Sequence, residues 1–261
     1  MCARTSGRSP RAMGVSTNQH FSVSTLRRMR HPEYTYSRAE STAPRIHRVG
    51  HAPARSNAPL ATVPYLQSVI PTNRLRFLAD ICRQALQRSP GHVLEVGVYR
   101  GGSLGVLAQV VNEVCPRYRV IGVDTFSGHP YSDNHPVHPQ GKYADVDTTV
   151  LRTALDGQVY GSLVDLHRGR VEAILDSLNL DNIAFAHIDC DLYLPVRHCA
   201  QEVPRLMKPD GCIYFDDYGH EHCPGATRAV LEVFPSRALH EVYMPDDRTC
   251  WSCHFRLDEL A

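Results

Sequence analysis

The sequence predicts an α/β fold in which helices cover both faces of a mostly parallel β-sheet. Short apolar runs alternate with segments of helical periodicity, and the connections between them are mostly short. Polar or glycine-rich residues follow four of the apolar runs. The chain of 261 residues carries 28 Lys and Arg against 27 Asp and Glu, with 43% hydrophobic residues. This composition is typical of a soluble globular protein, and no apolar stretch approaches the roughly 20 residues that span a membrane.

The expected elements follow one another in order. Apolar residues recur at helical spacing over 73–87, and Pro90-Gly91 ends that helix. Five strands are expected at 92–96, 119–123, 163–166, 183–188 and 212–215. Helices are expected around 104–111, 150–155, 171–178, 194–206 and 226–234. Two final strand-like runs, 239–244 and 251–257, have no helix between them and predict an antiparallel closing pair.

The first 60 residues differ from the rest of the chain. They contain ten arginines but only two acidic residues, Glu33 and Glu40. We expect a basic, flexible extension at 1–60 and a single domain at 61–261. A targeting segment remains an alternative for the extension, as does an arm that binds nucleic acid. The acidic body and the lack of interleaved aromatic residues disfavour nucleic acid as the partner.

Nine cysteines are dispersed through the chain, mostly inside apolar runs. An odd count without a secretory signal indicates a reducing compartment, so we expect a cytoplasmic protein. Cys250, Cys253 and His254 match the C-x-x-C-H spacing of haem attachment, but the surrounding run alternates like a terminal strand. We therefore interpret this match as coincidence, and a zinc site lacks a second cysteine pair at finger spacing.

A glycine-rich turn follows the first expected strand and contains Gly97, Tyr99, Gly101 and Ser103. Its G-x-x-x-G-G spacing differs from the G-x-G-x-x-G of dinucleotide sites, which disfavours a nicotinamide oxidoreductase. The turn suits a ligand whose amino-acid portion lies over the loop. Asp124, which ends the second strand, suits the two hydroxyls of a ribose. S-adenosylmethionine has both parts, whereas a tight turn with a helix-capping Asp is the alternative.

Four carboxylates follow the fourth and fifth expected strands. They are Asp189, Asp191, Asp216 and Asp217. Because the carboxyl ends of parallel strands meet at one edge, these groups should repel one another unless a cation compensates. Asp189, Asp216 and Asp217 form a plausible all-oxygen set for Mg²⁺, which leaves Asp191 as a general base. The alternative is that two or three of them cap helices.

Four segments together resemble the macrocin-type O-methyltransferases, which are class I, metal-dependent enzymes that methylate sugar hydroxyls. The segments are Leu-Glu-Val-Gly-Val-Tyr-Arg-Gly-Gly-Ser at 94–103, Val-Asp-Thr-Phe-Ser-Gly-His-Pro at 123–130, His-Ile-Asp-Cys-Asp-Leu-Tyr at 187–193, and Phe-Asp-Asp-Tyr-Gly at 215–219 with Cys-Pro-Gly-Ala at 223–226. The resemblance covers roughly residues 65–257. Cys190, where relatives often carry a small residue, is a minor departure.

The resemblance implies a Rossmann-like, mostly parallel seven-stranded sheet with an antiparallel closing strand. It implies Mg²⁺ at Asp189, Asp216 and Asp217, with Asp191 as the base. It places S-adenosylmethionine near the turn and the second strand, at Glu95, Gly97, Tyr99, Gly101, Ser103 and Asp124. The acceptor would be a glycoside of a natural product or a saccharide, and a homo-oligomer stays open. Related catechol enzymes carry a Lys base three residues after the first metal Asp, where this chain has Leu192, so a sugar is preferred to a catechol.

The long connection at 127–147 is expected to form a lid over the acceptor. It contains two tyrosines and three histidines: Tyr131, Tyr143, His129, His135 and His138. The histidines could touch sugar hydroxyls or lie in solvent. His220, His222 and Cys223 could form a second metal site; the alternative is that they only shape the turn after the Asp pair.

Overall fold

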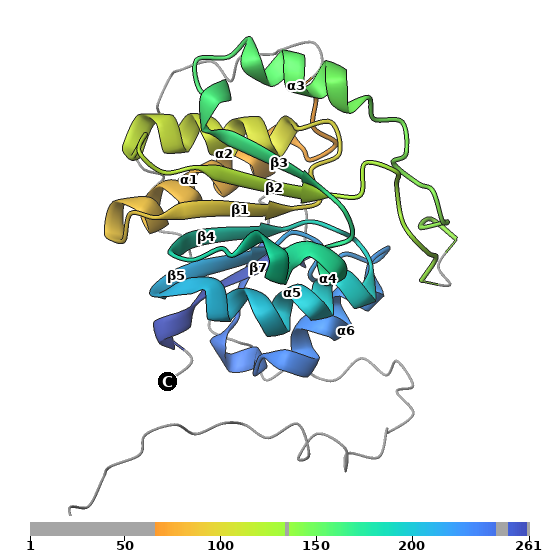
Figure 1. Ribbon diagram of the computed structural model, residues 1–261. Helices are drawn as coiled ribbons and strands as arrows, with labels where there is room; N and C mark the ends of the chain where they lie inside the picture. The colour runs from red at the N-terminus through yellow and green to blue at the C-terminus, as the bar shows by residue number, and fades with distance from the viewer. Residues whose placement is uncertain (1–65, 134–135, 244–249, 260–261) are drawn as a thin grey trace, which may run out of the picture. The chain divides into compact units, whose positions relative to one another are not determined.

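The computed structural model describes residues 66–133, 136–243 and 250–259 (Figure 1). The predicted extension at 1–60 and His135 of the lid lie outside these residues. A nucleic-acid-binding role for the basic arm therefore stays an untested alternative. Among the helices that the structure describes, none has both the length and the apolar character needed to cross a membrane.

One sheet contains all the strands of this part of the chain, in the order β3-β2-β1-β4-β5-β7-β6. The strands are β1 (His92–Val96), β2 (Val120–Asp124), β3 (Val164–Arg168), β4 (Ile183–Ile188), β5 (Met207–Phe215), β6 (His240–Tyr243) and β7 (Cys250–Arg256). The first five are parallel, and β7 runs antiparallel to both of its neighbours, β5 and β6. The predicted mostly parallel sheet with an antiparallel closing strand is confirmed.

Helices lie on both faces of the sheet (Figure 1). They are α1 (Thr72–Arg88), α2 (Gly102–Val114), α3 (Thr148–Asp156), α4 (Val171–Ile174), α5 (Tyr193–Leu206) and α6 (Pro224–Val233). The helix predicted at 171–178 is divided, because α4 continues as a 3₁₀ turn over Leu175–Leu178. Asn179 then takes a left-handed conformation, with φ of 47°, and ends the segment.

Two apolar layers hold the sheet between its helices. Val93 of β1 packs with α1, α2 and α3, whereas the next residue, Leu94, packs with α5 and α6 on the other face. This alternation follows from the strand period of two, and both faces of β1 are buried. Burying a side chain such as Leu94 fully contributes about 1.5–3 kcal/mol. The parallel strands are therefore held rigidly, and their carboxyl ends form a stable frame for the residues that follow them.

The strand order reverses between β1 and β4. The chain builds β1, β2 and β3 toward one edge and then returns to place β4 on the other side of β1. The helices that follow β1 and β4, α2 and α5, consequently pack on opposite faces of the sheet, and a crevice forms at the carboxyl ends, where open α/β sheets bind ligands. The segment after β2 leaves this same end of the sheet and returns to α3 (Figure 1).

Candidate active site

A cavity of about 560 Å³ lies at the carboxyl ends of the parallel strands. It collects most of the residues that the sequence singled out. They are Gly97, Tyr99, Ser103, Asp124, Asp189, Asp191, Asp216 and Asp217. Glu95 and Gly101 do not line it. Eight of the ten site residues predicted from the sequence therefore line one cavity, and their roles in binding stay predictions.

The glycine loop after β1 is packed directly against the end of β4. Gly97 has a φ of +95°, and a Cβ added there would lie 1.6 Å from the carbonyl oxygen of Asp189. The backbone N–H of Asp189 also donates to the carbonyl of Val96, at 2.8 Å. Only glycine fits this position. The turn and the first carboxylate of the site are thus one rigid unit.

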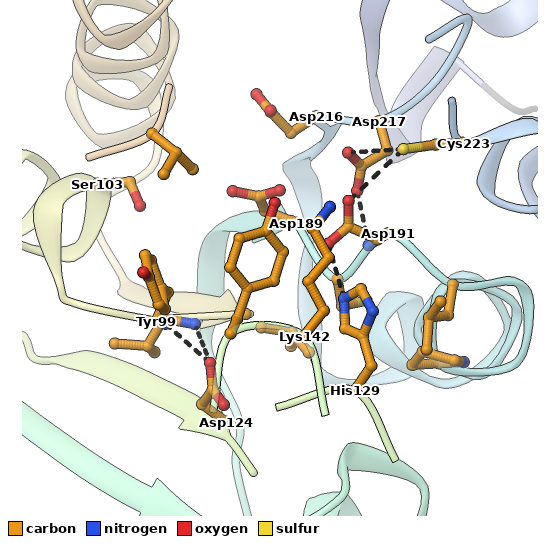
Figure 2. Close-up of a pocket in the computed structure, with 18 of the residues that line it drawn as sticks. Tyr99, Ser103, Asp124, His129, Lys142, Asp189, Asp191, Asp216, Asp217 and Cys223 are labelled. Atoms are coloured by element: carbon orange, nitrogen blue, oxygen red, sulfur yellow. Dashed lines mark hydrogen bonds and ion pairs between the residues drawn. The ribbon is translucent and has the colours of Figure 1, made fainter. Parts of the chain in front are cut away.

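Asp124 ties the glycine loop to the end of β2. Its Oδ2 accepts the backbone N–H groups of Val98 and Tyr99, each at 2.8 Å, and its Oδ1 accepts that of Phe126 at 2.7 Å. Figure 2 shows the hydrogen bonds that Oδ2 accepts from this backbone, with Asp124 beneath Tyr99. Asp124 therefore shapes the loop as well as lining the cavity. The predicted bonds to ribose hydroxyls would add to these.

Glu95 does not line the cavity, but it interacts with Ser103, which does, and with His187. Its Oε1 lies 2.9 Å from Nδ1 of His187, and both side chains are fully buried. Burial opposes a charge on His187, but the carboxylates of Asp216 and Glu95 outweigh it and raise the pKa of His187 to about 10. His187 thus brings positive charge to the edge of the site. Gly101, in the left-handed region with φ of +79°, is the N-cap residue of α2.

The three predicted metal ligands belong to two neighbouring clusters. In the first cluster, ligand atoms of Asp189, Asp216 and His187 lie within 4.8 Å of one another. In the second cluster, ligand atoms of Asp217, Asp191 and Cys223 lie within the same distance of one another. Burial and the nearby carboxylates raise the pKa of Asp189 and of Asp217 well above its ordinary value. The two clusters form one region of excess negative charge.

Arg74 partly balances that charge. This residue of α1 forms a buried ion pair with the carboxylate of Asp216 and also donates to the Asp216 carbonyl, at 2.9 Å. Burial opposes ionisation of Asp216, but His187 and Arg74 outweigh it and lower its pKa. Arg74 is not among the site residues predicted from the sequence. The available signal was its place four residues before Leu78, on the face of α1 that the apolar residues bury.

Asp191 is held by the segment predicted as a lid. Its Oδ2 accepts a hydrogen bond from His129 Nε2 at 3.0 Å, and its Oδ1 lies 3.6 Å from His138 Nδ1. Its own backbone N–H donates to Oδ2 of Asp217, at 2.8 Å. Burial disfavours the charge on Asp191, yet both histidines and Lys142 outweigh burial and lower its pKa. Figure 2 shows His129 and Lys142 reaching toward the carboxylates.

The lid segment is anchored to itself by a short ladder. The N–H of His129 donates to the carbonyl of Lys142 at 2.8 Å, and the N–H of Gly141 donates to the carbonyl of His129 at 2.9 Å. From this segment His129, His138, Lys142 and Tyr143 line the cavity, whereas Tyr131 does not. Two of the three lid histidines therefore face the site and are buried. Opening and closing of the segment stays a prediction.

The segment after β3 also lines the cavity, and the sequence argument missed it. Gly169, Arg170, Val171 and Glu172 contribute to the wall. Residues after β3 lie at the same carboxyl edge of the sheet as those after the other parallel strands. No acidic residue directly follows β3, so the sequence carries no polar signal at this strand end.

The two remaining groups of sequence candidates lie in different parts of the structure. His220, His222 and Cys223 all line the cavity, and the thiol of Cys223 contacts Asp191 and Asp217, at 3.6 Å from each. At the end of the chain, Cys253 packs in the layer of α5 and α6, whereas His254 stacks on Tyr214. Neighbours on β7 thus point to opposite faces, as the strand interpretation of the C-x-x-C-H segment predicts.

Comparison with known proteins gives a consistent result. Residues 94–218 match a family described as "Methyltransferase domain". The chain is 26% identical over 183 residues to mycinamicin III 3''-O-methyltransferase of Micromonospora griseorubida, covering 65% of this chain and 70% of that protein.

Solved structures share the fold at lower identity. The calicheamicin methyltransferase CalS11 superposes with a TM-score of 0.59 at 22% identity, over 71% of this chain and 80% of that one. The O-methyltransferase NovP superposes with a TM-score of 0.61 at 20% identity, over 72% of this chain and 81% of that one.

Proposed function

We propose that this chain, which is an enzyme of the macrocin-type O-methyltransferases, transfers a methyl group from S-adenosylmethionine to a sugar hydroxyl. The sugar would belong to a glycosylated natural product or a polysaccharide precursor, and the reaction would take place in the cytoplasm. One observation carries the proposal: the glycine loop, Asp124 and four carboxylates line a single cavity. The 3''-O-methylation named for the mycinamicin relative supports a sugar as the acceptor.

The cofactor end of the cavity is the part near β1, β2 and β3. Gly97, Tyr99 and Ser103 would surround the amino-acid portion of S-adenosylmethionine, and Asp124 its ribose. The wall formed by Gly169–Glu172 would complete the nucleoside side, because it follows the next strand along the same edge.

The carboxylate end of the cavity has the donors that a hard cation prefers. Asp189, Asp216 and Asp217 offer only oxygen ligands, and burial, together with neighbouring carboxylates that Arg74 and His187 do not fully balance, raises the pKa of Asp189 and Asp217. We therefore propose that these three residues hold Mg²⁺. Bound there, Mg²⁺ would supply a lowered pKa for the acceptor hydroxyl and a fixed position for its oxygen.

Asp191 would take the proton of the acceptor hydroxyl. Its Oδ2 accepts from His129 at 3.0 Å, and its Oδ1 has only the longer contacts to Cys223 and His138, each at 3.6 Å, so Oδ1 is the oxygen that would receive the proton. The lowered pKa keeps Asp191 ionised at neutral pH but also makes it a weak base. This carboxylate can act only on a hydroxyl whose own pKa has been lowered, which is why the base and the cation site need each other. His129 and the lid would also exclude water from the reacting oxygen.

The proposal is tested first by binding. Calorimetric titration of the full chain with S-adenosylhomocysteine should show micromolar affinity, with NADH as a negative control. Asp124→Ala should weaken this affinity, because the variant loses the bonds that shape the loop. Asp189→Ala and Asp216→Ala should keep the affinity but lose methyl transfer. Failure of the well-folded wild-type protein to bind S-adenosylhomocysteine would refute the proposed function.

The acceptor and the metal are tested by activity. Transfer of labelled methyl groups to a panel of glycosides and nucleotide sugars should require Mg²⁺ and should stop in excess EDTA. A catechol in the same panel addresses the alternative acceptor; Leu192, at the place of the Lys base in the catechol enzymes, is buried and apolar. Full activity of Asp189→Ala in excess chelator would refute the role of the metal in the mechanism. Transfer to the catechol alone would show that the acceptor is a catechol and not a sugar.

A further inference from the structure

The lid segment also contacts the body of the enzyme through Asp133, a few residues beyond His129. Oδ2 of Asp133 accepts the backbone N–H of Tyr193 at 2.5 Å. Tyr193 is the first residue of α5, and the N-cap residue, Leu192, has no polar side chain that could accept this N–H. The N–H groups in the first turn of a helix have no partner within the helix. Asp133 therefore supplies the missing acceptor from 60 residues away.

The start of α6 leaves room for this carboxylate. Gly225 lies in the first turn of α6, and a Cβ added there would lie 2.5 Å from Oδ2 of Asp133 and 3.1 Å from Cβ of Tyr193. Asp133 therefore occupies the space that a side chain at position 225 would need. The carboxylate lies beside the amino ends of both α5 and α6, where the partial positive charge of a helix stabilises a negative group.

The backbone just before α5 has an uncommon conformation at Asp191. Its φ of +58° lies in the left-handed region, which residues other than glycine rarely adopt. Such a conformation persists where the surrounding contacts hold it. The N–H of Asp191 donates to Oδ2 of Asp217 at 2.8 Å, and Asp133 fixes the N–H of Tyr193 just beyond it. His129 holds the carboxylate itself, at 3.0 Å. The backbone of Asp191 is thus fixed at the residue itself and immediately after it.

We propose that Asp133 is a positioning residue that holds Asp191 in its left-handed conformation. Asp133 does not line the cavity, so it acts through the backbone of Tyr193 and not on the acceptor. Gly225 has a part in the same arrangement, because its missing side chain makes room for the carboxylate. The consequence for catalysis rests on the proposed function, in which Asp191 takes the proton of the acceptor hydroxyl.

The first test is amide hydrogen exchange, measured by NMR on the perdeuterated full-length protein after backbone assignment. In Asp133→Ala the amide of Tyr193 should exchange roughly 5- to 30-fold faster, because its acceptor is lost. The amide of Asp191 should exchange at least about 3-fold faster, because the backbone beyond it is no longer fixed. Gly225→Ala should speed the same two amides, although alanine ordinarily favours a helix over glycine.

The second test is the effect on methyl transfer. Asp133→Ala should lower kcat at least about 10-fold, because a small displacement of the base is costly to the reaction. The affinity for S-adenosylhomocysteine should stay within about 2-fold of the wild type, because Asp133 does not line the cavity. Asp133→Asn keeps an oxygen that can accept the Tyr193 N–H, so its kcat should lie within about 3-fold of the wild-type value.

Asp147→Ala is the matched control. Asp147 also caps a helix, because its Oδ1 accepts the N–H groups of Thr149 and Val150 at the start of α3, at 2.8 and 3.2 Å. It does not line the cavity. Asp147→Ala should therefore lose a comparable cap but leave the exchange of Tyr193 and kcat within about 2-fold of the wild type. Circular dichroism should show that all variants are folded.

Unchanged exchange of Tyr193 in Asp133→Ala would overturn the capping contact. Faster exchange of Tyr193 with an unchanged amide of Asp191, or with an unchanged kcat, would overturn the positioning role. A loss of kcat in Asp147→Ala equal to that in Asp133→Ala would do the same. The exchange measurements need neither S-adenosylmethionine nor an acceptor, so a failure of the proposed function would show in the S-adenosylhomocysteine titration alone.

Discussion

Arg74 should be a main determinant of stability, although it lines the cavity that holds the four carboxylates. Arg74 and Asp216 are 7% and 4% exposed, and their side chains form an ion pair that a second bond to the Asp216 carbonyl reinforces. Removing one partner of a buried pair leaves the other charge uncompensated and costs about 3–5 kcal/mol. Arg74→Met keeps the apolar stem and removes the charge. At about 2–4 °C per kcal/mol for a domain of this size, its melting temperature should fall by roughly 6–20 °C.

The assay is a double-mutant cycle followed by urea unfolding at pH 7 in EDTA. The free energy of unfolding is measured for the wild type, Arg74→Met, Asp216→Asn and the double variant. The sum of the two single losses should exceed the loss in the double variant by a coupling energy of about 2–3 kcal/mol. Arg76→Met serves as the control, because Arg76 is exposed on the same helix and its replacement should change stability by no more than about 0.5 kcal/mol.

The result that would refute this reasoning is a coupling energy below about 0.5 kcal/mol, since Arg74 and Asp216 would then contribute independently. A loss in Arg76→Met equal to that in Arg74→Met would refute it as well, because the effect would belong to α1 and not to the buried charge.

Two further changes test the fold around the site and the closing strands. Burial lowers the pKa of His254 to about 4, so the unfolded chain binds this proton at a higher pH than the folded one. Stability should therefore decrease by up to about 3 kcal/mol as the pH falls from about 6.5 to about 4, and urea unfolding of His254→Gln should lack this part of the decrease. Gly97→Ala should fail to bind S-adenosylhomocysteine, because its Cβ would overlap the carbonyl of Asp189. Gly141→Ala, at a similar φ of +80° but with no atom within 4 Å of the added Cβ, should bind normally and lose only about 1 kcal/mol on thermal unfolding; equal behaviour of the two variants would contradict the steric argument.

Most of the fold could be predicted because its strands are uninterrupted apolar runs bounded by turn residues. β1 and β4 begin and end where the sequence places them. β5 begins at Met207, ahead of the predicted 212, although Pro209 and Gly211 are typical of a turn. Met207 pairs with Ile183 across a register shift, so pairing with β4 extends the strand where the local pattern does not.

The candidate site could be predicted only where its members follow strand ends. Asp189 and Asp216 were found in this way, because parallel strands bring their ends together whatever the intervening sequence. Arg74 lies 142 residues from Asp216, and His129 lies 62 residues from Asp191. Such contacts depend on how α1 and the lid pack against the sheet, and no local pattern in the sequence reports that packing.

The distribution of charge explains why these distant partners matter to the proposed chemistry. Arg74 and His187 keep Asp216 ionised, and His129, His138 and Lys142 do the same for Asp191, so both carboxylates have a lowered pKa. Burial and the neighbouring carboxylates raise the pKa of Asp189 and Asp217, which have less positive charge beside them. Positive side chains therefore compensate the charge of Asp216 and Asp191 more fully than that of Asp189 and Asp217. A divalent ion would bind at Asp189 and Asp217, beside an ionised Asp191, which is the arrangement that methylation of a weakly acidic sugar hydroxyl requires.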